Sequence, residues 1–525
     1  MTTDYKSKLY NRTSEIIIKI SVVLILVILS LAILSDSMTK PVGRDEQMYC
    51  TAGVLISQGK MIYKDFSYVA QLPYHPLLYA ILFKALNTNR YLLVGRLVSV
   101  VSDILVMLCI VAIYRYAFGK FRILGLLFAM CAAVLYVYNP VVDYANGYAW
   151  NNDVVILCIA LSFLLFVRLE SNRKDKYLHI AAIGALLTLA TFMRMTTALV
   201  ELLFLIMLLS LPARNLKERV RIILPFVVAA VIVSIYPTFV IAQAPEAAFI
   251  DIFKIHMLNG EWLHQIGIVH NKLGLTLMSL TLPGYFVLLV ITAYLTITFI
   301  LLRHKMKISN SKSVILAGFL SLIFFAVALS LPVTWIQHFA PPVPFLIIGF
   351  AFLLFFLTEL SRRQNLKIPF KTGVVLMIFS VFVAFITDKK ISKTIPACFT
   401  PQGWVPMQVH NIAADIAKKT KEPKLVLTTA PLFALEGGCE IYTQLSAGVF
   451  AYRINGLLSN QERRITNTVG PKNLKEMVKK SPPSAIIVGT EPPYFSFLEE
   501  PLESFAGVDW KNEIYENGLT VYFKP

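Results

Sequence analysis

The sequence predicts an α-helical polytopic membrane protein with a small α/β domain at its C-terminal end. Of the 525 residues, 57% are hydrophobic and 15% are charged, whereas soluble domains carry about 25% charged residues. Apolar stretches recur over residues 1–387, and the composition becomes more polar over residues 388–525. These observations exclude a wholly soluble enzyme, a disordered chain and a disulfide scaffold.

The first part of the chain contains eleven apolar stretches that can cross a hydrocarbon layer of about 30 Å as helices. We expect these spans near residues 16–35, 91–114, 123–139, 153–168, 177–193, 196–212, 222–242, 275–302, 313–333, 340–360 and 372–387.

The net charge of +18 indicates membrane topology rather than nucleic-acid binding. Residues 388–525 are nearly balanced, with 16 basic and 14 acidic residues, so the surplus of positive charge lies in the hydrophobic part of the chain. Six basic segments alternate with less basic loops, and the positive-inside rule places all six in the cytoplasm. Because eleven is an odd number of spans, residues 388–525 are then expected on the outer face. The predicted outer segments contain no N-glycosylation sequon, which favours a bacterial inner membrane. The basic segments contain Lys6/Lys8/Arg12/Lys19, Arg115/Lys120/Arg122, Arg168/Arg173/Lys174/Lys176, Arg214/Lys217/Arg219/Arg221, Arg303/Lys305/Lys307/Lys312 and Arg362/Arg363/Lys367/Lys371.

Three outer segments between spans, 36–90, 140–152 and 243–274, are candidate working loops, with a short fourth at 334–340. The first contains the apolar run Leu77–Leu86, which is too short to span and predicts an interfacial helix. The third has a similar run around Phe249–Leu258. We therefore expect a transmembrane domain over 1–387 whose outer loops lie at the membrane surface.

Residues 388–525 have the pattern of a small α/β domain. Strands are expected at Lys424–Thr428, Ala485–Val488 and Leu519–Phe523, and helices at Ile412–Lys419 and Leu474–Lys480. Cys398 and Cys439 both fall in this domain, and whether they form a disulfide stays open.

Carboxylates near the outer membrane edge are the first candidates for chemistry. Asp45 and Glu46 are adjacent to Arg44 and follow the first span closely, which favours a functional role. Asp153 begins the fourth span, where helix capping is an equally good explanation. Arg194 lies at a span edge, where a charge needs either a structural partner or a polar cavity.

Histidines gather in the outer segments, where His256 and His338 are candidates for binding an anionic group. A structural role is the alternative for each, and their spacing matches no zinc signature. We therefore predict no metal ligands among them.

The first outer loop resembles that of the GT-C glycosyltransferases, with the protein O-mannosyltransferases and the lipid A aminoarabinose transferases as the nearest families. The resemblance rests on Arg44-Asp45-Glu46-Gln47-Met48-Tyr49, then Gly59-x-x-x-Tyr63-x-Asp65-Phe66 and Pro73-x-x-Pro76. Asn151-Asn152-Asp153, Gln337-His338-Phe339-x-Pro341 and the segment Gln444–Phe450 add to it.

This resemblance implies transfer of a sugar from a polyprenyl-phosphate donor on the outer membrane face. It implies that Asp45 is the base and that Asp153 is a second carboxylate of the site. It also implies that Tyr49, Tyr63 and Asp65 line the donor pocket. We add four further candidate binding residues, Glu46, Arg194, His256 and His338. Met48 stands where the aminoarabinose transferases have arginine, so the donor sugar stays open. The acceptor, a lipid, glycan or protein, also stays open.

The chemistry needs one base and nearby cations, because phosphate is a good leaving group and requires no general acid. The outcome expected is inversion. No cofactor is required, although a divalent metal would fit near carboxylates. A transporter or lipid flippase is the alternative function, but such proteins usually place charges near the membrane midplane and show inverted repeats. A membrane-anchored assembly protein is a further alternative, and it would need neither Asp45 nor a cavity.

Overall fold

A computed structural model describes residues 2–171, 175–269, 271–306, 311–387, 393–516 and 518–525. Within these residues, eight helices are long and apolar enough to cross a membrane, and three further apolar helices are shorter. The long helices are α1 (Thr2–Thr39), α4 (Tyr91–Ala117), α7 (Asn152–Ser171), α10 (Leu216–Gln243), α14 (Pro283–Leu302), α15 (Ser311–Ser330), α16 (Pro342–Gln364) and α17 (Lys367–Thr387). The shorter ones are α5 (Arg122–Val137), α8 (Lys176–Thr191) and α9 (Ala198–Leu209). Each predicted span falls on one of these helices, and the multi-pass helical prediction is confirmed.

One predicted span, 275–302, begins later than expected. The structure divides this stretch into α13 (Lys272–Thr281) and α14, which starts at Pro283. Proline fits the first turn of a helix because its missing N–H has no partner to lose there, and it disfavours helical backbone in the residue before it. Leu282 accordingly has ψ 128°, so the chain turns between the two helices.

The bundle has an interior helix and a lipid-facing rim. Along α16 nearly every side chain from Pro342 to Leu360 is buried, whereas α10 exposes large apolar side chains such as Val231, Ile232 and Ile235. An apolar helix that is exposed along its length is stable only in a hydrocarbon environment. The exposed apolar faces therefore support a membrane location for the bundle.

The outer loops fold into short helices. Segment 36–90 forms α2 (Arg44–Ser57) and α3 (Tyr74–Leu86), and segment 140–152 contains α6 (Pro140–Ala145). Segment 243–274 contains α11 (Pro245–Phe249), a π-helical turn η2 (Ile250–Lys254) and α12 (Ile255–Gln265). Both predicted interfacial helices are thus helical. Shorter turns in the first part of the chain are η1 (Met195–Thr197), η3 (Arg303–Lys305) and η4 (Ile336–Phe339).

The C-terminal part forms a five-stranded sheet in the order β2-β1-β3-β5-β4. The strands are β1 (Leu425–Leu427), β2 (Glu440–Ile441), β3 (Ala485–Val488), β4 (Lys511–Ile514) and β5 (Thr520–Phe523), of which β2, β1 and β3 are parallel and β5 is antiparallel to both β3 and β4. The three strands predicted are present. The short edge strands β2 and β4 were not predicted, because two residues, or an exposed polar run such as Lys511–Ile514, carry little apolar signal.

Helices cover this sheet and connect its strands. They are α19 (Val405–Lys419), α20 (Pro431–Glu436), α21 (Val449–Ile454), α22 (Asn460–Ile465), α23 (Leu474–Lys480) and α24 (Glu500–Glu503). Short turns are η5 (Ile395–Phe399), η6 (Pro401–Gly403), η7 (Thr443–Leu445), η8 (Asn455–Leu457), η9 (Pro471–Asn473) and η10 (Pro493–Leu498). Cys398 and Cys439 are not bonded to each other: the Cys398 thiol lies 3.0 Å from the Leu31 carbonyl oxygen of α1, and Cys439 is buried in the C-terminal part.

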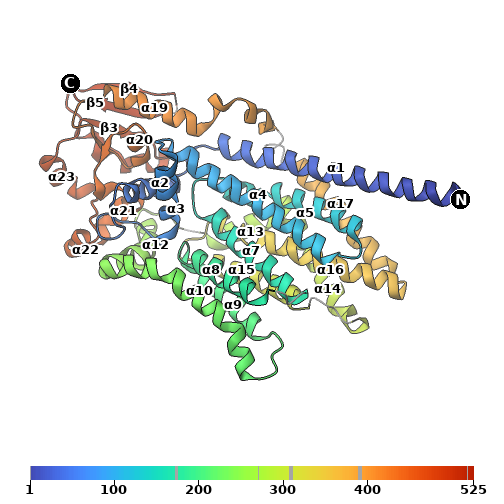
Figure 1. Cartoon of the computed structure of the whole chain (residues 1–525). Helices are drawn as coiled ribbons and strands as arrows, with labels where there is room; N and C mark the ends of the chain where they lie inside the picture. The colour runs from blue at the N-terminus through green and yellow to red at the C-terminus, as the bar shows by residue number, and fades with distance from the viewer. Residues whose placement is uncertain (1, 172–174, 270, 307–310, 388–392, 517) are drawn as a thin grey trace.

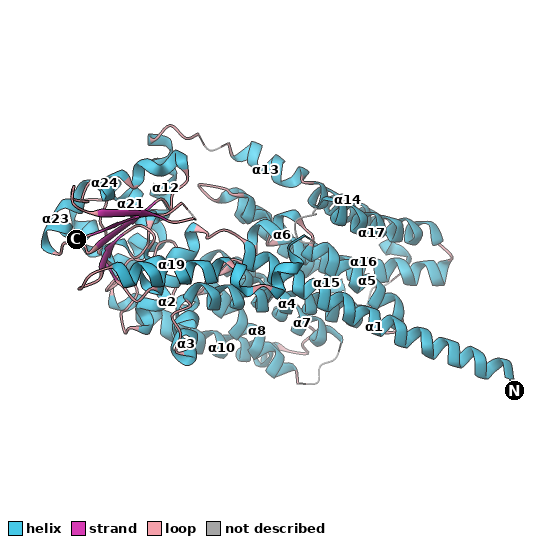
Figure 2. Cartoon of the chain, turned by 90° about the horizontal axis from the view of Figure 1, so that it is seen from above, coloured by secondary structure: helices cyan, strands magenta, loops and turns pink. Residues whose placement is uncertain are grey.

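The sheet and its helices lie at one end of the bundle, beside α2, α3 and α12, and the N-terminus lies at the other end (Figures 1 and 2). A single buried apolar cluster joins the outer loops to the sheet. Polar contacts reinforce it: the Leu92 amide donates to Glu436 Oε1 at 2.6 Å, and Leu432 N donates to Gln47 Oε1 at 3.1 Å. Arg173, Lys174 and Lys307, from the predicted basic segments, lie outside the described residues.

Candidate active site

The first turn of α2 is held by a buried ion pair between Glu46 and Arg96 of α4. Arg96 Nε lies 2.8 Å from Glu46 Oε1, and Arg96 Nη2 lies 2.8 Å from Oε2. The backbone amides of Gly43 and Ala149 each donate to the same carboxylate at 2.7 Å. Both side chains are fully buried. Paired and fully hydrogen-bonded charges are the form in which burial is tolerated.

Arg96 also connects α2 to the end of α1. Its Nη1 donates to the carbonyl oxygens of Ser37 at 2.7 Å and Lys40 at 2.8 Å, and its Nη2 donates to that of Pro41 at 3.0 Å. These carbonyls end α1 and begin the turn into α2. The arginine therefore fixes the position of the residue next to Glu46, which is Asp45.

Asp45 is half-buried and forms no hydrogen bond or ion pair within the described part of the chain. Burial raises its pKa to about 6, and the nearby positive charges of Arg453, Arg44 and Arg194 limit the rise, while Glu46 adds to it. A carboxylate with this pKa is largely ionised at neutral pH and accepts a proton more readily than an ordinary aspartate. It is free to act on a substrate.

Two arginines from distant parts of the chain flank Asp45. Arg194 precedes η1, and its Nη1 donates to Asn152 Oδ1 at 3.0 Å. Arg453 comes from α21, and its guanidinium lies 5.1 Å from the ring centres of both Trp262 and Phe450. Burial and the charge of Arg44 lower the pKa of Arg453 to about 10. The Nε of Arg453 is buried and has no hydrogen-bond partner among the described residues.

Tyr49 lies one helical turn after Asp45 on α2. It packs edge-on against Tyr68, with ring centres 6.0 Å apart, and against His75 at 5.0 Å. Burial and the charge of Asp45 raise the pKa of Tyr49. The tyrosine therefore stays neutral and forms an apolar wall beside the carboxylate.

Of the remaining predicted site residues, Glu46 and Asp153 are buried and already have partners. Glu46 belongs to the ion pair described above. Asp153 is fully buried at the start of α7, and its Oδ2 accepts the Gly147 amide at 2.9 Å. Neither is hydrogen-bonded to Asp45, so the structure gives each a role in shaping the outer loops.

Tyr63, Asp65 and His338 also form local structural contacts. The Tyr63 hydroxyl donates to the Gln71 carbonyl at 2.6 Å, and the exposed Asp65 accepts the Met61 amide at 2.7 Å. His338 Nδ1 accepts the Trp335 amide at 3.1 Å. His256 is half-buried on α12, where burial lowers its pKa. The structure thus brings together Asp45, Glu46, Tyr49 and Arg194 from the predicted set. Among the described residues, no hydrogen bond or ion pair joins the other members to Asp45.

Two functional candidates were not predicted from the sequence. Arg453 lies three residues after the segment Gln444–Phe450, and that segment was the only sequence signal near it. Asp251 is buried in η2 and accepts the Ser67 hydroxyl at 2.8 Å and the Tyr68 amide at 3.0 Å. Burial raises the pKa of Asp251 to about 7. Among the described residues, no group of three or more His, Cys, Asp or Glu side chains is arranged to hold a metal ion.

The helical bundle, its outer loops and the C-terminal sheet have the fold of the GT-C glycosyltransferases. Residues 72–240, about a third of the chain, match the family model described as dolichyl-phosphate-mannose-protein mannosyltransferase. The predicted likeness to this superfamily is confirmed at the level of the fold.

Particular solved structures are similar over nearly the whole chain. ArnT from Cupriavidus metallidurans in the apo state has a TM-score of 0.59 and 14% identity, covering 98% of each chain. ArnT bound to undecaprenyl phosphate has a TM-score of 0.58 and 14% identity, covering 95% of this chain and 97% of that one. The oligosaccharyltransferase of Archaeoglobus fulgidus has a TM-score of 0.52 and 10% identity, covering 96% of this chain and 74% of that one. A search of curated proteins finds no match.

Proposed function

We propose that the chain is a membrane glycosyltransferase that moves a sugar from a polyprenyl-phosphate donor to an acceptor hydroxyl. The observation that carries this proposal is an unpartnered carboxylate, Asp45, flanked by Arg194 and Arg453 at the end of the first span. The fold supports it, since the similar ArnT structure is bound to undecaprenyl phosphate. The similar archaeal oligosaccharyltransferase AglB, with a TM-score of 0.50 and 10% identity, is in complex with a dolichol-phosphate.

In this mechanism Asp45 removes the proton of the acceptor hydroxyl as its oxygen attacks the anomeric carbon. The bond from that carbon to the phosphate oxygen breaks, and the lipid phosphate leaves with the electron pair. A positioned general base contributes about 10²–10⁴ in rate. One displacement by one nucleophile inverts the anomeric centre, unlike the double displacement of retaining enzymes.

Arg194 and Arg453 supply the positive charge that the leaving phosphate needs. Guanidinium groups bind phosphate through paired N–H donors, and partial burial strengthens the interaction. Arg453 has a buried Nε without a partner among the described residues, so this N–H is available to donate a hydrogen bond to a bound phosphate. Glu46 then acts through Arg96 as a positioning residue for Asp45, and Asp153 shapes the loop before α7.

We propose that this site faces the outer side of a bacterial inner membrane. The exposed apolar rim supports the membrane location. The basic turns at the end opposite the sheet support the orientation. The lipid tail of the donor would lie in the bilayer while its phosphate reaches the water boundary near Asp45. No observation in the described part of the chain favours a transporter or flippase.

The test is transfer by Asp45→Asn in vesicles that contain a polyprenyl-phosphate-linked sugar. We expect activity to fall by about 10²–10⁴, with normal expression and an unchanged Tm. Asp509→Asn, at an exposed site in the C-terminal part, is the matched control and keeps full activity. Transfer that persists with EDTA is expected, because the mechanism requires no cofactor. Full activity of Asp45→Asn would remove Asp45 from the role of base.

A further inference from the structure

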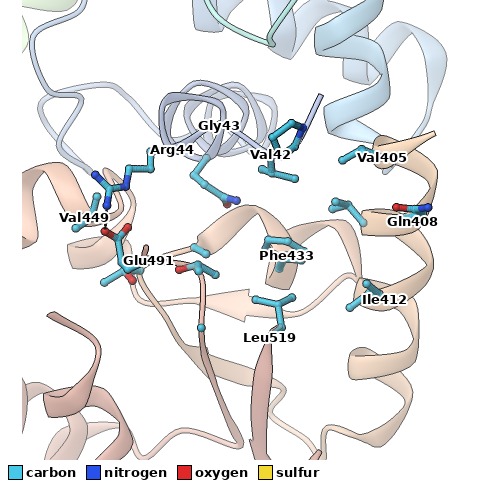
Figure 3. Close-up of a pocket in the computed structure, with 17 residues that line it drawn as sticks. Val42, Gly43, Arg44, Val405, Gln408, Ile412, Phe433, Val449, Glu491 and Leu519 are labelled. Carbon is cyan, nitrogen blue, oxygen red and sulfur yellow. Dashed lines mark hydrogen bonds and ion pairs between the residues drawn. The ribbon is translucent and has the colours of Figure 1, made fainter. Parts of the chain in front are cut away.

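A cavity lies between the start of α2, at Gly43 and Arg44, and the C-terminal part of the chain (Figure 3). Its volume is about 330 Å³, at the lower end of the range of about 300–1,000 Å³ found for small-molecule sites. Asp45 does not line it. Arg44, the neighbour of Asp45, does line it, so the cavity adjoins the candidate active site without including its carboxylate.

The sheet topology explains why a cavity forms here. From β1 the chain crosses to β2 on one side, and it later returns to β3 on the other side of β1. In open parallel sheets, ligands bind at the carboxyl ends of strands where the order reverses in this way. Thr429 and Ala430 follow β1, Gly489 and Thr490 follow β3, and all four line the cavity.

One buried polar group in this cavity lacks a partner. Thr429 is 4% exposed, and its hydroxyl has no hydrogen bond among the described residues. Most buried hydroxyls are hydrogen-bonded, so an exception calls for an explanation. Because Thr429 lines the cavity, a turn of its side chain toward a bound ligand would supply the missing partner.

The walls are unsuited to an anion. The amides of Gly489 and Thr490, which would otherwise bind a phosphate, already donate to the Glu499 carboxylate at 3.0 and 3.1 Å. The one guanidinium that lines the cavity, Arg44, is paired with the carboxylate of Glu491. The cavity as a whole is close to neutral.

The remaining surface combines apolar and hydrogen-bonding groups. Ile412, Phe433 and Leu519 form an apolar side, and Gln408 and the Arg44–Glu491 pair offer donors and acceptors (Figure 3). A pyranose ring has the matching character, with an apolar face and a rim of hydroxyls. We propose that this cavity binds a neutral saccharide of one or two units. The proposal concerns binding alone and does not depend on the transfer reaction.

The experiment uses the full chain in nanodiscs without glycoside detergents, whose sugar head groups would compete. Methyl α-mannopyranoside and methyl N-acetyl-β-glucosaminide are titrated by saturation-transfer NMR and by the shift in Tm. We expect saturable binding of at least one glycoside. Thr429→Val, which keeps the shape and removes the hydroxyl, is expected to weaken it about tenfold, and Thr429→Ser to restore it.

Two further variants make the test specific. Thr400→Val, at an exposed site outside the cavity, and Asp45→Asn are both expected to bind the glycoside like the unmodified protein. The proposal is overturned if folded protein binds neither glycoside, or if Thr429→Val binds it unchanged. It is also overturned if inorganic phosphate or dodecanoate competes at the site more strongly than the glycosides do.

Discussion

Replacing Glu46 by Gln tests whether the buried pair with Arg96 holds the first turn of α2. Each carboxylate oxygen of Glu46 accepts one arginine N–H and one backbone amide. A glutamine NH₂ in either place would face two donors, and Arg96 would lose its counter-charge. Removing one partner of a buried pair costs about 3–5 kcal/mol. For a chain of this size we expect Tm to fall by about 3–5 °C.

The assay is thermal unfolding in nanodiscs, followed by tryptophan fluorescence, together with transfer activity. The control is Glu15→Gln, which breaks the exposed pair of Glu15 and Lys19 on α1. Solvent screens such a pair, so its loss should leave Tm nearly unchanged. In the double variant Glu46→Gln/Arg96→Gln, the two losses should overlap by about 1–3 kcal/mol. The reasoning is refuted if Glu46→Gln unfolds at the same Tm as Glu15→Gln.

Three further predictions concern titration and topology. Since burial raises the pKa of Asp45 to about 6, the rate of transfer should fall about tenfold between pH 7.5 and pH 5. Arg453→Gln removes a charge that lowers this pKa, so the midpoint of the pH–rate profile should move to higher pH. A shift to lower pH would contradict the assignment of Asp45 as the base. The folded-state pKa of Asp251, about 7, lies above its ordinary value. The stability that this carboxyl group contributes is therefore lost as the pH rises from about 4 to 7. Asp251→Asn should have a higher Tm than the unmodified protein at pH 8 but not at pH 4. A reporter enzyme fused after Pro525 should be active only on the outer face; cytoplasmic activity would reverse the proposed orientation.

Much of the architecture could be predicted because hydropathy acts locally. A run of about twenty apolar residues must become a helix in a bilayer, whatever surrounds it. For the same reason the segment 36–90 could be placed at the membrane edge, and Asp45 within it could be named as a candidate base. The start of α14 at Pro283 was missed because hydropathy alone does not register the break that proline imposes.

The composition of the site depended on contacts between distant residues. Glu46 and Asp45 are neighbours with the same charge, yet the structure pairs Glu46 with Arg96 and gives Asp45 no hydrogen bond or ion pair with any described residue. Arg453 reaches Asp45 from α21, some 400 positions later. The segment Gln444–Phe450 nearby did not point to Arg453 itself, because its place beside Asp45 arises only when α21 packs against α12.

The sequence by itself determined the multi-pass helical architecture, the change to an α/β segment, and the loop after the first span that holds Asp45. Only the tertiary structure decided which carboxylate is left unpaired, which arginines surround it, and where the sheet leaves a cavity. The physical reason is range: helix formation in a bilayer follows from local apolar content, whereas pairing, desolvation and pKa depend on groups that folding brings together.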